Sequence, residues 1–186
     1  MQDVQGFINS ETQLGHFIHS SLHSKQENDG IYMNARDSNG STPFHTACSL
    51  GKVEAVKLIL DFSQENEQID LNASDDRGMT AFHQACSFGF KEMTQLILNF
   101  TKENGRIDLN ARDEHGDTAF QVACIWGNKE TAKMILENWK EFGIDLKIRN
   151  NAGHTALDMN MDRRPELKAM LEEEYSKIDA SEPVDT

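Results

Sequence analysis

The 186-residue sequence contains no long apolar run and few basic residues. No stretch approaches the roughly 18 apolar residues of a membrane span, and the first residues lack the basic and apolar regions of a secretory signal. Eighteen Lys and Arg stand against 31 Asp and Glu, which gives a net charge of −13. This charge argues against nucleic-acid and membrane ligands and favours a basic partner protein. We therefore expect a cytoplasmic or nuclear protein.

Cysteine is also scarce, and its three residues occupy equivalent places in similar segments 38 residues apart, at Cys48, Cys86 and Cys124. Stacked helices lie about 8–10 Å apart, whereas a disulfide allows a Cα spacing of at most about 7 Å. The long spacing also matches no zinc motif. We expect three reduced core residues, which suits the same compartments.

Motifs that would indicate an enzyme are missing as well. The sequence has no Gly-rich phosphate loop, no Ser-His-Asp order and no acid pair in a recognisable setting. His16, His19 and His23 fall at i, i+3 and i+7 of a predicted helix and could share a metal ion. A solvated polar face is favoured, because no neighbouring Cys or Asp pattern completes a ligand set. We expect a non-enzymatic protein without a cofactor.

What the sequence does contain is a repeated segment. The stretch from Asn34 to Cys48 returns at residues 72–86 and 110–124 and, in degraded form, at 147–158. The turn glycines follow at steps of 38, 38 and 37 residues, at Gly40, Gly78, Gly116 and Gly153. A period between about 20 and 50 residues indicates a stack of like units, each too small to bury its own apolar face.

Each full repeat predicts two helices. A threonine can cap a first helix of about eight residues, which ends at a glycine suited to the left-handed conformation. The caps are Thr42, Thr80 and Thr118, and the glycines are Gly51, Gly89 and Gly127. The longer second helices are predicted at residues 53–66, 91–104 and 129–142. The segment from Ile69 to Asn72 and its copies then return in extended form and build a hairpin.

The box Thr-(Pro/Ala)-Phe-His-x-Ala-Cys, followed by a Leu-Ile-Leu run, resembles the ankyrin repeat, whose signature is Thr-Pro-Leu-His-x-Ala. The resemblance covers residues 34 to about 158. Ankyrin repeats have about 33 residues, so each unit carries about five more, within 61–69 and 99–107. These residues favour helix, and we expect them to lengthen the second helices by about a turn. The resemblance implies an all-α solenoid of stacked helix-turn-helix units with short β-hairpin or turn projections.

The repeat pattern also predicts the domain organisation. Both end segments depart from the internal pattern, as expected of units that expose one flank to water. The predicted segments are a degenerate N-terminal cap at 1–33, ankyrin repeats at 34–71, 72–109 and 110–146, a C-terminal cap at 147–177 and a disordered acidic tail at 178–186.

Positions at which the repeats disagree are the candidates for partner binding. The resemblance implies that the hairpin tips and the residues before the helix-ending glycine form the concave face, which selects partners. That glycine is preceded by Leu50, Phe88 and Trp126 in successive repeats. We predict the partner-binding residues Leu50, Arg77, Met79, Phe88, Glu114, His115, Asp117, Ile125 and Trp126. The alternative is that the longer helices tilt the stack and bury the apolar members between repeats.

These residues predict a monomeric scaffold or inhibitor that binds another protein with a basic or apolar surface. One alternative is an inhibitor of a basic transcription factor, because acidic ankyrin chains resemble the inhibitors of Rel-type factors. Another is a targeting arm of a larger multidomain protein.

Two further sites follow from the resemblance. It assigns His45 and His83, in the Thr-x-Phe-His box, to structural hydrogen bonds that tie hairpin to helix. Asn72 and Asn110 resemble the hairpin asparagine that the hypoxia-linked asparaginyl hydroxylase modifies in many ankyrin proteins, so both are predicted hydroxylation sites.

Overall fold

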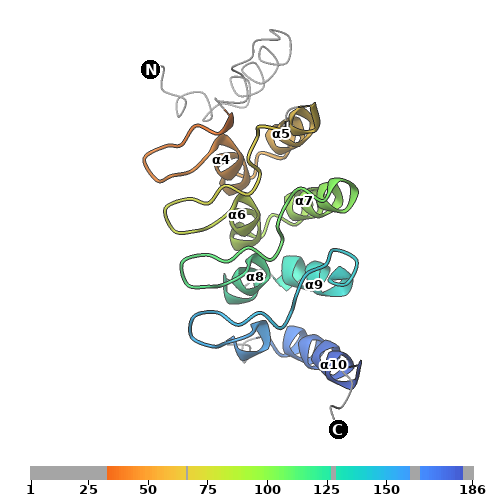
Figure 1. The fold of residues 1–186 in the computed structure, drawn as a ribbon. Coiled ribbons are helices and arrows are strands. Elements are labelled where there is room, and N and C mark those ends of the chain that lie inside the picture. Colours follow the sequence, from red (N-terminus) through yellow and green to blue (C-terminus); the bar gives the residue numbers. More distant parts are fainter. Residues whose placement is uncertain (1–32, 66, 127–128, 160–163, 182–186) are drawn as a thin grey trace.

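The computed structural model describes residues 33–65, 67–126, 129–159 and 164–181, and it shows helices stacked in two rows (Figure 1). The first row contains α4 (Pro43–Ser49), α6 (Ala81–Phe88), α8 (Ala119–Trp126) and the short 3-10 helix η1 (Ala156–Asp158). The second row contains α5 (Val53–Glu65), α7 (Lys91–Asn104), α9 (Lys129–Asn138) and α10 (Pro165–Ser181). Each layer pairs one helix of each row, which confirms the predicted all-α solenoid.

The loops that precede the first-row helices all project on the same side of the stack (Figure 1). We call them fingers, and they comprise residues 34–41, 72–79, 110–117 and 147–154. Within the described part of the chain they contain isolated bridges, Ser74 to Thr80 and Arg112 to Thr118, and no strand. The predicted hairpins are therefore turns, two of them closed by a single bridge. Backbone hydrogen bonds between neighbouring fingertips, such as Glu114 N–H to the Arg77 carbonyl at 2.9 Å, hold the fingers together.

The first-row helices begin where the sequence predicts. Thr42 and Thr80 are extended N-cap residues, and Pro43 opens α4 at a position that needs no N–H donor. After α6, Gly89 adopts a left-handed conformation with φ of 70°, which ends the helix. The predicted stop at Gly127 lies outside the described residues.

The second-row helices confirm the predicted extension in two repeats. α5 reaches Glu65 and α7 reaches Asn104, so both include part of the extra segment. The prediction for the third repeat was wrong, because α9 ends at Asn138 and residues 139–142 form turns. Phe62 and Phe100 occupy the equivalent position of the earlier repeats and anchor their helices in the core. Asn138 has no apolar side chain to bury, and its amide donates instead to the Met134 carbonyl.

The C-terminal helix is longer than expected. α10 continues to Ser181, so residues 178–181, which we assigned to a disordered tail, are helical. Ile178 packs against the apolar core and gives this last turn a tertiary contact. Residues 182–186, like 1–32 of the predicted N-terminal cap, lie outside the described residues.

One continuous apolar core runs between the two rows. Its members include Cys48, Cys86 and Cys124, each at most 1% exposed and each a free thiol, as expected. Burial away from water disfavours the thiolate and raises the pKa of all three thiols, that of Cys124 to about 12. These thiols are therefore packing groups that stay protonated at neutral pH.

The histidines of the repeated box join each finger to the preceding repeat. Nδ1 of His45 accepts the Thr42 N–H at 3.1 Å, and Nε2 lies 2.9 Å from the Met79 carbonyl of the next finger. His83 repeats this arrangement with the Asp117 carbonyl at 3.1 Å. Because a backbone N–H can only donate, Nδ1 is the acceptor and Nε2–H donates to the carbonyl. Both rings are buried, and the predicted structural role is confirmed.

Candidate partner-binding surface

Four large apolar side chains are exposed in the described part of the chain, and all lie at the C-terminal ends of the first-row helices. Leu50 is 47% exposed, Phe88 55% and Trp126 71%, and Ile125 is 38% exposed beside Trp126. We call Leu50, Phe88 and Trp126 the apolar ladder. The alternative that the longer helices bury them is wrong, because the extensions lengthen the second row and the ladder belongs to the first.

Local structure holds the middle of the ladder in place. Phe88 stacks on Phe90, with ring centroids 6.0 Å apart and an angle of 16° between the planes. Phe90 in turn lies against Gly51 of the previous repeat, where an added Cβ would meet its ring at 3.0 Å. Gly51 thus leaves room for the ring that supports Phe88. One side of the Phe88 ring is therefore packed although half of the side chain faces water.

Two hollows lie between the apolar ladder and the fingers. The first has a volume of about 520 Å³, and its lining includes Leu50, Phe88, Asp76 and Arg77. The second has a volume of about 420 Å³, and its lining includes Phe88, Trp126, Glu114, His115 and Arg77. They share Phe88 and Arg77, so the surface is continuous across three repeats. Each hollow combines apolar side chains from helices with charged side chains from fingers.

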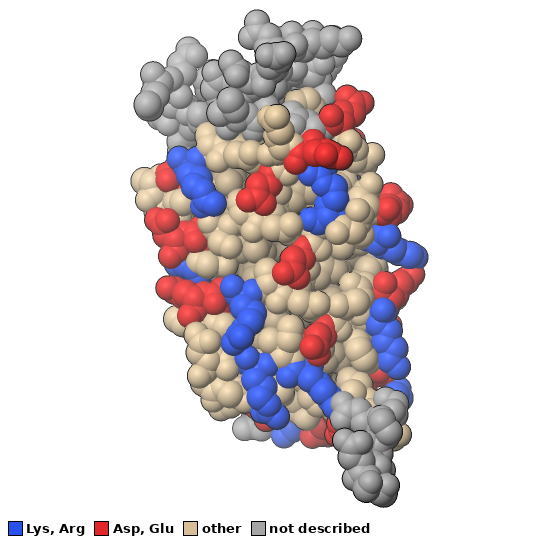
Figure 2. All heavy atoms as spheres, viewed as in Figure 1, with Lys and Arg blue, Asp and Glu red and all other residues tan. Residues whose placement is uncertain are grey.

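The acidic residues of the fingers have two different roles. Asp75 and Asp113 hold their turns, because Oδ1 of each accepts two backbone N–H groups of its own finger. Asp76 and Glu114 are exposed at the tips. Figure 2 shows acidic and basic side chains side by side along the finger edge of the molecule, at the left of the view. A ligand in the hollows would meet the carboxylates of Asp76 and Glu114.

Two of the predicted contact residues lie below the surface. Met79 is 8% exposed and Asp117 is 6% exposed, so the expectation that they project from the fingertips was wrong. Each precedes a threonine N-cap, and its carbonyl accepts a hydrogen bond from a histidine of the preceding repeat, His45 for Met79 and His83 for Asp117. The Asp117 carboxylate also accepts the Asn150 amide at 2.7 Å, and burial raises the pKa of Asp117. Arg77, Glu114, His115 and Ile125 remain exposed.

The two candidate hydroxylation sites are both hydrogen-bonded, and Asn72 is exposed whereas Asn110 is half-buried. Asn72 donates its amide to the Arg106 carbonyl at 2.8 Å and accepts the Asp108 N–H at 2.7 Å. Asn110 makes the same pair of bonds to Gly143 and Asp145, at 2.9 and 2.8 Å. Both therefore tie one repeat to the next, and hydroxylation there stays a prediction.

The described residues give no support for other site types. They contain no group of three His, Cys, Asp or Glu side chains that could hold a metal ion. His16, His19 and His23 lie outside them. None of the helices in the part of the chain that the structure describes is long and apolar enough to cross a membrane.

Sequence reasoning missed Phe90 and Trp139. Phe90 stands where the first repeat has Lys52, and Trp139 stands where the first two repeats have Ser63 and Thr101. Both are positions at which the repeats disagree, and this disagreement is the signal that could have identified them.

Comparison with known families agrees with the stacked architecture. A model of ankyrin repeats in three copies matches residues 13–104. A comparison with curated proteins gives no significant match. Ankyrin repeats mediate protein–protein interaction. The family match, the 38-residue period and the stacked helix pairs together show that this chain belongs to the ankyrin repeat family.

Proposed function

We propose that this chain acts as a monomeric, non-catalytic scaffold or inhibitor that binds a partner protein through the apolar ladder and the fingertips around it. The observation that carries the proposal is the exposure of Leu50, Phe88 and Trp126 at equivalent positions of three successive repeats. Exposure of three large apolar side chains in a row is unfavourable in water, whereas aromatic side chains contribute much of the binding energy at protein interfaces.

The charges around the apolar ladder favour a partner with basic residues beside apolar ones. Asp76 and Glu114 are exposed at the tips, and the whole chain carries a net charge of −13. Rim charges of this kind mainly accelerate association and reject partners of like charge. Replacing both residues by their amides, Asp76→Asn and Glu114→Gln, should slow association and weaken its salt dependence, with a smaller effect on dissociation.

The test is affinity capture with the wild-type chain beside the Phe88→Ala/Trp126→Ala variant, followed by calorimetry on the captured partner. Truncation of two ladder residues should cost about 2 kcal/mol or more of binding free energy. The control variant is Gln64→Ala/Asn99→Ala, which changes two exposed residues of the second row and should bind normally. Equal binding by both variants would exclude the apolar ladder as the interface.

A further inference from the structure

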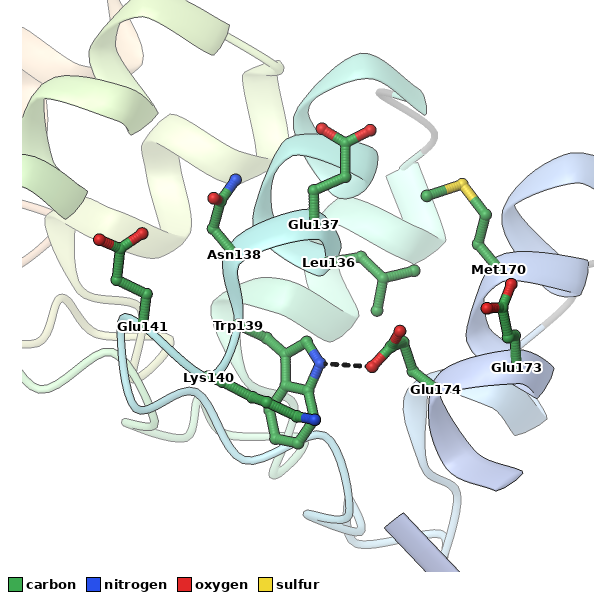
Figure 3. A pocket seen from close by; sticks show the side chains of 9 residues that line it. All are labelled: Leu136, Glu137, Asn138, Trp139, Lys140, Glu141, Met170, Glu173 and Glu174. Carbon is green, nitrogen blue, oxygen red and sulfur yellow. Dashed lines mark hydrogen bonds between the residues drawn. The ribbon is translucent and has the colours of Figure 1, made fainter. Parts of the chain in front are cut away.

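A third hollow lies away from the fingers, between the end of α9 and the outer face of α10 (Figure 3). Its volume is about 500 Å³, and it shares no lining residue with the two hollows of the apolar ladder. We call it the Trp139 groove, and its lining comprises Leu136, Glu137, Asn138, Trp139, Lys140, Glu141, Met170, Glu173 and Glu174. It is thus a separate surface, built from the second row alone.

The indole is specific to the third repeat. The equivalent residues Ser63 and Thr101 turn their hydroxyls onto carbonyls of their own helices, at 2.7 and 2.8 Å. Trp139 instead follows the early end of α9 and extends toward α10, where its Nε1–H donates to Glu174 at 3.0 Å (Figure 3). This bond fixes the ring against α10 and leaves the indole partly exposed in the groove.

The groove carries an excess of negative charge. Its lining contains Glu137, Glu141, Glu173 and Glu174 against Lys140. Three of the carboxylates have lysine partners outside the lining: Lys102 pairs with Glu141, and Lys177 pairs with Glu173 and Glu174. Glu137 is exposed and has no cationic partner among the described residues. The groove therefore favours a cation.

The chain itself already places a cation on this ring. The amino group of Lys140 lies 5.2 Å from the centroid of the Trp139 ring, within the range of a cation–π contact. Lys140 is exposed and sits at the rim, so rotation of its side chain would free the ring. An incoming cation would then take the same place over the indole, beside the Glu174 carboxylate (Figure 3).

An arginine side chain fits this arrangement better than a lysine. Its planar guanidinium can stack on an indole face while its N–H groups, fixed in a fork, donate to carboxylates. The lysine ammonium is a more strongly hydrated point charge without that geometry. We propose that the Trp139 groove is a second binding site, which takes an arginine side chain of a basic partner segment in place of Lys140.

The test uses the full chain and a synthetic peptide of three Gly-Ser-Arg units, with the same peptide carrying citrulline, which is uncharged, as the ligand control. The chain has two tryptophans, so the indole N–H region of a ¹⁵N correlation spectrum holds one signal for each surface. The Trp126→Phe variant assigns the Trp139 signal. That signal should move saturably with the arginine peptide, and the citrulline peptide should leave it unchanged.

A second comparison tests the displacement of Lys140. Lys140→Ala should bind the arginine peptide at least threefold more tightly than the wild type. Lys129→Ala removes the same charge from the start of α9, outside the groove, and should have a smaller effect. The inference is overturned if the Trp139 signal does not respond, if citrulline serves equally well, or if the two lysine variants bind alike. In the Phe88→Ala variant, which impairs the apolar ladder, the Trp139 signal should still shift with the arginine peptide. This result would show that the two surfaces bind independently.

Discussion

A matched pair of phenylalanines in α6 tests whether the apolar ladder is a surface and not part of the core. Phe82 is 1% exposed, whereas Phe88 at the end of the same helix is 55% exposed. The substitutions Phe82→Ala and Phe88→Ala remove identical atoms. Their effects on the free energy of unfolding should therefore differ only through burial and contacts.

The magnitudes follow from those exposures. Truncation of a fully buried Phe costs about 3–5 kcal/mol, because contacts are lost and a cavity remains. For Phe88, truncation returns on the order of 50 Å² of apolar area to water, or about 1 kcal/mol at 25 cal/mol per Å². Loss of the ring stacking on Phe90 adds up to about 1 kcal/mol. At about 3 °C per kcal/mol, Tm should fall by about 10 °C for Phe82→Ala and about 5 °C for Phe88→Ala.

Thermal unfolding followed by circular dichroism, with urea titration as a second measurement, gives both values. Binding to the captured partner should show the opposite order, since Phe88→Ala removes a contact residue and Phe82→Ala does not. A Phe88→Ala variant as unstable as Phe82→Ala would contradict this prediction and would show that the apolar ladder is part of the core.

Three further outcomes are expected. Burial lowers the pKa of His83 below its ordinary value of 6.5, so the unfolded chain binds this proton at a higher pH than the folded chain does. The free energy of unfolding should therefore decline as pH falls below 6.5. In urea titrations the His83→Gln variant should show a weaker pH dependence, and an unchanged pH dependence would contradict this role of His83. Gly78→Ala should destabilise more than Gly105→Ala: both positions have positive φ, but a Cβ at Gly78 would lie 2.7 Å from a backbone nitrogen of the next finger, whereas Gly105 faces open space. Treatment with an asparaginyl hydroxylase should add one oxygen atom each to Asn72 and Asn110, and an unchanged intact mass would dispose of both sites.

Much of the fold could be read from local pattern. In α6, Thr80 caps the helix, Phe82 packs in the core and Gly89 ends the helix. The sequence has equivalent residues at the same spacing in every full repeat. The structure confirms these roles. The end of α9 could not be predicted in this way, because it depends on Asn138 having no apolar side chain to dock in the core.

The candidate surfaces were predicted only in part. The sequence showed that one position of the repeat is occupied by Leu50, Phe88 and Trp126 in turn. It did not determine whether these side chains are exposed or buried. Met79 was expected at a fingertip because the resemblance to the ankyrin repeat assigned it to the hairpin tip. The hydrogen bond that its carbonyl accepts from the previous repeat holds it below the surface. That bond joins residues 34 positions apart, so no local pattern reveals it.

The repeat, the helix pairs, the free cysteines and the structural histidines were predictable because each depends on residue type at a fixed spacing. Which side chains face water and which distant residues meet, as Trp139 and Glu174 do across the groove, depends on how one repeat packs on the next. Exposure is a property of a side chain together with all its neighbours in space, and those neighbours include residues of the adjacent repeat.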